Sequence, residues 1–204
     1  MKKLLVGVLI LIYSSCKTLS DNNNIKNRKK MEKINVKEFK TKGIESESGS
    51  SFKMVKNDTI EEMNELEDIF IKYTYKINSP YKNTKVYYKD NLTLKEEGNS
   101  FYMIPVGISK KYDKKGKIVE EKNLDEINGR IFSVEQLIDK MKKKFDINLT
   151  DVSKIGASIR YDPRYGYNYV ILVRNYEKPG FHREFKVDVK NGEVLSDMIV
   201  TFRK

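Results

Sequence analysis

Tyrosine and arginine gather in one short stretch of this sequence, DPRYGYNY at residues 162–169. Both side chains are enriched where proteins bind one another, because each covers a large area and carries a polar group. The candidate partner-binding residues are Arg160, Arg164, Tyr165, Tyr167 and Arg174, with Tyr161, Tyr169 and Tyr176 nearby in the chain. The pattern predicts a contact surface on a loop. The alternative is that the tyrosines pack within a sheet and that the loop is an ordinary one.

Residues that could perform catalysis are few and do not form a known pattern. His182 is the single histidine, and no serine or cysteine nucleophile in a triad-like arrangement accompanies it. We interpret it as a loop or sheet-edge residue. Asp162 and Asp188 could pair for hydrolysis, but Asp162 precedes Pro163 as a turn former does, and Asp188 fits the outward position of an alternating strand. The sequence therefore predicts no catalytic residue, no cofactor and no metal site.

The single cysteine, Cys16, stands directly behind an apolar run. Lys2 and Lys3 precede that run at residues 4–12, which is too short to cross a bilayer. The stretch resembles a bacterial lipoprotein signal peptide, although Tyr13 stands where that family most often has leucine. The resemblance implies that residues 1–15 are removed and that Cys16 becomes a diacylated N-terminus, which anchors a protein stably. The alternative is an ordinary signal peptide cut nearby.

The predicted export to the envelope determines what holds the exported part together and which partners it meets. With Cys16 lipidated, no cysteine is left for a disulfide, a redox pair or a metal site. The resemblance implies a protein anchored to the cell envelope through its lipid. Lys17 is not the aspartate that commonly retains such proteins in an inner membrane, so the sequence favours the outer membrane.

The net charge of +11 is concentrated near the anchor. Residues 17–56 carry 11 basic and 5 acidic side chains, whereas the residues from 57 onward carry 27 and 24. We interpret residues 16–56 as a flexible basic tether, whose lysines could contact anionic head groups; an AT-rich genome would explain the same composition. The basic residues form no aromatic-bearing motif, so nucleic acid is not an expected partner.

Residues 57–128 are predicted to be rich in β-structure. Residues 57–68 are ambiguous, because Ile60, Met63 and Leu66 are spaced like one helix face. Residues 69–77 alternate with period two and predict a half-buried strand. Shorter strands are expected at 85–88, 101–104, 107–112 and 117–121, with turns at 97–99 and 115–116, as in an antiparallel meander.

One of these hairpins, GISKKYDKKGKIVEEKN at residues 107–123, resembles a MORN-variant repeat. The matching positions are Gly107, Tyr112, Asp113, Gly116 and Ile118. Residues 85–98 resemble a degraded earlier copy without the turn glycine. The resemblance implies a β-ribbon scaffold and no particular activity.

Residues 129–204 give clearer local signals. Ser133 and Gln136 form a capping-box pattern, and the apolar residues of 134–145 fall on one helical face. Strands are expected at 155–161, 167–174 and 183–189. Asn191-Gly192 then indicates a hairpin to a last strand.

The block at residues 168–197 resembles a PepSY-type module. The matching positions are Val187, Asp188, Gly192, Val194 and Leu195, and the helix at 134–145 stands where such a module needs it. The resemblance implies a non-catalytic, exported α+β module, of a family associated with restraint of peptidases or with binding at the envelope.

The sequence as a whole predicts an α+β protein of antiparallel sheets, with one amphipathic helix packed on a C-terminal three- to four-stranded sheet. Its expected parts are residues 1–15, 16–56, 57–128 and 129–204. The expected function is a protein- or peptide-binding module anchored at the envelope. The alternatives are an immunity or inhibitor lipoprotein against a toxin or hydrolase, a structural envelope protein without a discrete ligand, and an enzyme with an unrecognised site.

Overall fold

The computed structural model of the protein describes residues 31–175 and 180–201. The predicted signal peptide, Cys16 and Tyr176 lie outside the described residues. The described residues lie in one compact unit. Within the described ranges, no helix combines the length and the apolar character needed to cross a membrane.

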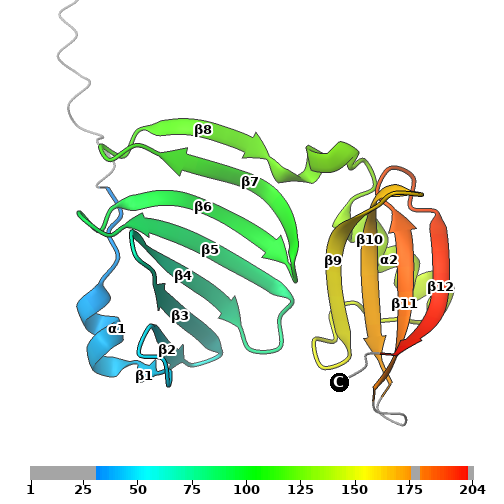
Figure 1. Ribbon diagram of the computed structural model, residues 1–204, viewed down its shortest axis with the longest axis horizontal. Helices are drawn as coiled ribbons and strands as arrows, with labels where there is room; N and C mark the ends of the chain where they lie inside the picture. The colour runs from blue at the N-terminus through cyan, green and yellow to red at the C-terminus, as the bar shows by residue number, and fades with distance from the viewer. Residues whose placement is uncertain (1–30, 176–179, 202–204) are drawn as a thin grey trace, which may run out of the picture. The chain divides into compact units, whose positions relative to one another are not determined.

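The first half of this unit is one antiparallel sheet whose eight strands follow one another in chain order (Figure 1). Each strand pairs with the next through a short turn, so the sheet is a simple meander. Its strands are β1 (Ile44–Glu45), β2 (Ser51–Lys56), β3 (Thr59–Glu65), β4 (Ile69–Lys76), β5 (Tyr81–Tyr88), β6 (Leu94–Phe101), β7 (Ile104–Tyr112) and β8 (Ile118–Asn123). The predicted meander is confirmed, and the sheet is larger than the sequence indicates.

The prediction of a tether up to residue 56 is wrong for its last part. Helix α1 (Val36–Lys42), β1 and β2 lie in this stretch. Asn35 caps α1 by accepting a hydrogen bond from the amide of Glu38. Phe39, Phe52 and Met54 are buried in a hydrophobic cluster with residues of β3 to β6. A seven-residue helix is too short to be stable alone, so this packing holds it.

The sheet decides one ambiguous segment and corrects two other local predictions. Residues 59–65, which the sequence left ambiguous, form the strand β3. Gly98, predicted to lie in a turn, is inside β6, at an irregularity in the pairing with β7. The strand predicted at 101–104 is instead a tight turn, because Phe101 pairs with Ile104 and Tyr102 takes a φ of 52° between them. Pairing with neighbouring strands determined each outcome.

The second half places helix α2 (Val134–Phe145) before a four-stranded antiparallel sheet in the order β12-β11-β10-β9. A short 3-10 helix, η1 (Leu124–Gly129), leads into it. The strands are β9 (Ile155–Asp162), β10 (Gly166–Arg174), β11 (Phe181–Asp188) and β12 (Val194–Thr201). The predicted capping box is confirmed: Ser133 accepts from the amide of Gln136, whose side chain accepts from the amide of Ser133.

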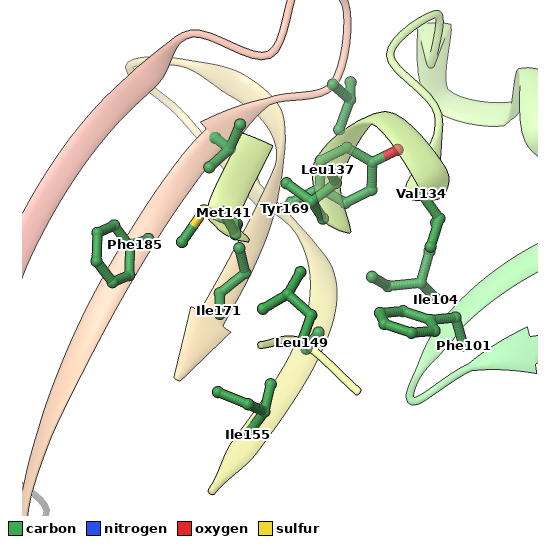
Figure 2. Packing of buried hydrophobic residues seen from close by; sticks show 13 residues of the cluster. Phe101, Ile104, Val134, Leu137, Met141, Leu149, Ile155, Tyr169, Ile171 and Phe185 are labelled. Atoms are coloured by element: carbon green, nitrogen blue, oxygen red, sulfur yellow. The ribbon is translucent and has the colours of Figure 1, made fainter. Parts of the chain in front are cut away.

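Helix α2 packs its apolar face on this sheet. Leu137 and Met141 are fully buried against Tyr169, Ile171 and Phe185 (Figure 2). Phe101 and Ile104 of the first sheet belong to the same cluster. The β6–β7 turn adds two hydrogen bonds, from the Tyr102 hydroxyl to the Leu149 carbonyl (3.0 Å) and from the Met103 amide to the Ala157 carbonyl (3.2 Å). The prediction of a helix on a C-terminal sheet is confirmed, within a protein that has more β-structure than expected.

Candidate functional site

The β9–β10 hairpin carries most of the tyrosines and arginines that the sequence singles out. Its turn begins at Asp162, whose carbonyl accepts from the amide of Tyr165 (3.1 Å) and whose carboxylate accepts from the amide of Arg164 (2.9 Å). Gly166 follows with a φ of 74°, which glycine adopts without strain. These bonds fix the turn, so the side chains at the end of the hairpin stand on a rigid support.

Tyr161 and Tyr167 form an exposed aromatic pair at the end of the hairpin. They lie directly opposite one another in the pairing of β9 with β10. Their ring centroids are 5.3 Å apart in an edge-to-face arrangement, yet 65% of Tyr161 and 41% of Tyr167 remain exposed. They share a sheet face with Tyr169 and Ile171, which are buried in the cluster with α2. The pair therefore extends the apolar face of the sheet into solvent.

The turn adds an arginine and a third tyrosine. The guanidinium carbon of Arg164 lies 5.2 Å from the ring centroid of Tyr165, a cation–π distance. Both side chains are exposed. We define the hairpin patch as Tyr161, Arg164, Tyr165 and Tyr167. It presents three aromatic rings and one cation, a composition typical of binding hot spots.

Asp162 is held under the patch by two cations. Its carboxylate accepts from the ammonium of Lys186 (2.8 Å) and contacts the guanidinium of Arg164 (3.4 Å). Lys186, followed by the Arg164 amide and guanidinium, keeps the pKa of Asp162 well below its ordinary value. Lys186 lies opposite Val170 in the pairing of β10 with β11, so it is on the sheet face away from the aromatic pair. It balances the charge of Asp162 from that face, and Arg164 is the cation on the patch itself.

This arrangement predicts a pH-dependent contribution to stability. A carboxyl group whose pKa is lowered by folding stabilises the folded protein above its unfolded pKa of about 3.9. That contribution is lost as the pH falls toward the folded pKa. We expect Lys186→Met to lower the urea midpoint at pH 7 and the difference from the parent protein to shrink between about pH 5 and pH 2. A difference that stays constant over this range would contradict the role of Asp162.

Arg160 belongs to the hairpin but not to the patch. It pairs with Asn168, which points to the opposite face from Tyr161 and Tyr167. Arg160 is exposed. Asn168 is fully buried and donates from its amide nitrogen to the carbonyl of Gly166 (3.0 Å). Asn168 thus supports the turn from behind, a role that its sequence position alone did not reveal.

The structure separates the remaining predicted residues from the patch. Arg174 ends β10, eight residues from Gly166, and a strand of that length spans about 26 Å. Its guanidinium donates to the Ser153 carbonyl (3.3 Å), and it borders a shallow pocket with Lys154, Phe181 and His182.

Tyr169 is fully buried and donates its hydroxyl to the Phe132 carbonyl. Burial raises the pKa of Tyr169 to about 12. Tyr161, absent from the candidate binding residues, instead forms the more exposed half of the aromatic pair.

Of the residues considered for catalysis, His182 lies elsewhere than the sequence indicates, whereas Asp188 follows the buried Val187 in the alternation of β11. His182 is not at a sheet edge: it lies in β11, between Arg174 of β10 and Val200 of β12. The carboxylate of Asp188 accepts from the amides of Lys190 (2.6 Å) and Asn191 (3.2 Å), so it shapes the β11–β12 turn. In residues 31–175 and 180–201, no group of three or more histidine, cysteine, aspartate or glutamate side chains is arranged as metal ligands would be.

Comparison with protein-family models, with curated proteins and with solved structures finds no match to this chain.

Proposed function

We propose that this protein is a non-catalytic binding module, anchored to the bacterial envelope through an acylated Cys16, that holds a protein or peptide partner on the hairpin patch. The observation that carries the proposal is the aromatic pair of Tyr161 and Tyr167, exposed on a rigid support. Tyrosine has few rotatable bonds, so a partner that packs on it orders few side-chain torsions.

The surroundings of the patch favour a partner with both apolar and acidic groups. Three rings offer apolar area, and Arg164 lies over Tyr165. Because Lys186 pairs closely with Asp162 from the opposite face of the sheet, Arg164 is left as the cation that an acidic group of the partner meets on the patch. A carboxylate of the partner would accept two parallel hydrogen bonds from the planar guanidinium of Arg164.

The order of elements also supports the proposal. Helix α2 is followed by the four antiparallel strands β9 to β12, which is the order implied by the resemblance to a PepSY-type module. Under this proposal the four-stranded sheet with α2 is the binding part, and the eight-stranded sheet is the scaffold between it and the membrane anchor.

A crosslinking experiment in the native envelope tests this function. The intact chain is compared with a variant that carries Arg164→Ser, Tyr165→Ser and Tyr167→Ser. The surface control carries Lys53→Ser and Tyr81→Ser, which remove an exposed lysine and an exposed tyrosine from the other sheet. All three proteins are first checked for folding by thermal denaturation.

We expect one specific crosslinked species with the intact chain and the control, and at least a tenfold loss with the patch variant, since hot-spot side chains each contribute about 1–2 kcal/mol or more. Equal crosslinking of all three folded proteins, or no specific species with any of them, would contradict the proposal and favour a structural role without a discrete ligand.

A further inference from the structure

The edges of the two sheets differ in how they are protected. An edge strand has backbone amides and carbonyls without a partner on one side, and proteins commonly block such strands against unwanted pairing. In the described part of the chain the edges are β1 and β8 of the first sheet and β9 and β12 of the second.

Three of these edges carry a recognisable block. Strand β1 has only two residues, so it offers little backbone for pairing. Strand β8 is rich in charge, with Glu120, Glu121 and Lys122 along its middle. The edge of β9 is occupied by the β6–β7 turn, where the Met103 amide donates to the Ala157 carbonyl.

Strand β12 has none of these blocks among the described residues. It is eight residues long, VLSDMIVT, and contains no proline and no lysine. Met198 is 46% and Ile199 63% exposed, and as neighbours in a strand they point to opposite faces. The single charge, Asp197, accepts hydrogen bonds from Nε and Nη2 of Arg183 at 2.8 and 2.7 Å. The edge is therefore long and apolar on both faces, and its one charged side chain is paired with Arg183.

We propose that β12 pairs in antiparallel fashion with β12 of a second copy of this chain, joining two four-stranded sheets into one. The two-fold axis lies midway between the Ile199 residues of the two copies. Ile199 then lies opposite Ile199 of the other copy, Met198 opposite its Val200, and Asp197 opposite its Thr201. The pairing uses the regular part of the strand, beyond the irregularity between Lys186 and Val187.

The side chains of β12 fit a copy of themselves better in this register than in one shifted by two residues, which is the shift that moving the axis by one residue produces. With the axis at Ile199, two Met198–Val200 pairs lie on one face and the Ile199 pair lies on the other. An axis at Met198 would place Asp197 opposite Ile199 and Ser196 opposite Val200. The proposed register thus pairs apolar with apolar side chains and sets no two charges opposite each other.

The pairing is independent of the proposed function. Strand β12 is at the opposite edge of the sheet from β9, so the hairpin patch stays accessible in the dimer. An isologous contact of this kind closes after two copies, which removes the free edge without starting a filament.

Disulfide trapping tests the contact and its register. Single cysteines are introduced into the full chain, which carries Cys16→Ala and is purified in detergent. The three variants are Ile199→Cys, Met198→Cys and Val119→Cys. Opposed residues of an antiparallel pair have Cα atoms about 4.5–5.5 Å apart, which a disulfide spans, whereas the two Met198 positions would be about 8 Å apart. We expect a reducible dimer with Ile199→Cys and little with Met198→Cys or with Val119→Cys on the charged edge β8.

Light scattering of the detergent-solubilised chain supplies the second measurement. We expect twice the single-chain mass, and a return to the single-chain mass with Ile199→Lys, which places two ammonium groups opposite each other, while Val119→Lys on β8 leaves the dimer intact. Thermal denaturation confirms that both lysine variants are folded. A single-chain mass at every concentration, or equal trapping by all three cysteines, would overturn the proposal.

Discussion

The substitution Gly192→Ala is expected to destabilise the protein by about 3 kcal/mol, the sum of backbone strain and overpacking. Gly192 lies in the β11–β12 turn with a φ of 73°, a conformation that side chains with a Cβ rarely adopt. A Cβ at this position would also lie 2.5 Å from two ring carbons of Phe132. The urea midpoint and the melting temperature measure the loss.

Gly166→Ala is the matched control for this prediction. Gly166 has nearly the same φ, 74°, but a Cβ there would meet no atom within 4 Å. Its substitution should therefore cost only the strain of the left-handed conformation, about 1 kcal/mol. On a Phe132→Leu background, the cost of Gly192→Ala should fall toward that of Gly166→Ala. Equal costs for the two glycine substitutions in the parent protein would refute the clash with Phe132.

The substitution Arg130→Met is expected to cost about 3 kcal/mol, since it leaves buried acceptors without their donor. Arg130 is only 2% exposed. Its guanidinium donates to the backbone carbonyls of Pro105, Leu124 and Asp125 and to the carboxylate of Asp125 (2.9 Å). The other carboxylate oxygen of Asp125 accepts from the Gly107 amide (2.9 Å). Arg130 thereby ties η1 to the start of β7.

Two further substitutions separate this network from the loss of charge alone. Arg130→Lys keeps the charge but cannot reproduce the planar fork, so its stability should fall between those of the parent and Arg130→Met. Arg160→Met removes an exposed arginine and should change the unfolding free energy by less than about 0.5 kcal/mol. Urea denaturation at neutral pH gives all three values. A loss below 1 kcal/mol for Arg130→Met would show that the carbonyls find other donors.

Several elements could be predicted because their causes lie within a few residues of one another. Helix α2 has its cap, its apolar stripe and its C-terminal lysines in one segment of 13 residues. Strand β4 was indicated by the period-two alternation of its residue types in the sequence. The turn at Asp162 follows from an aspartate before a proline. Local hydrogen bonding and side-chain spacing determine such features, so the chain needs no distant partner to specify them.

The sequence did not predict the regular secondary structure in residues 34–56 or the position of Gly98 inside a strand. This stretch is polar in composition, and its few apolar residues, among them Phe39 and Phe52, are buried only because β3 to β6 supply the other side of the cluster. Gly98 suggests a turn in isolation, yet the pairing with Thr84 of β5 keeps it in a strand. Pairing and burial are non-local, so composition alone misplaces both.

The candidate site shows the same division. The sequence by itself determined that tyrosine and arginine cluster at residues 160–174 and that a turn lies between two strands, because residue types and turn chemistry are local properties. Only the tertiary structure decided that Tyr161 and Tyr167 form an exposed pair, that Tyr169 belongs to the core and that Arg174 lies at the far end of β10. A strand sends alternate side chains to opposite faces and separates its two ends, and the face that α2 covers fixes which tyrosines are left to meet a partner.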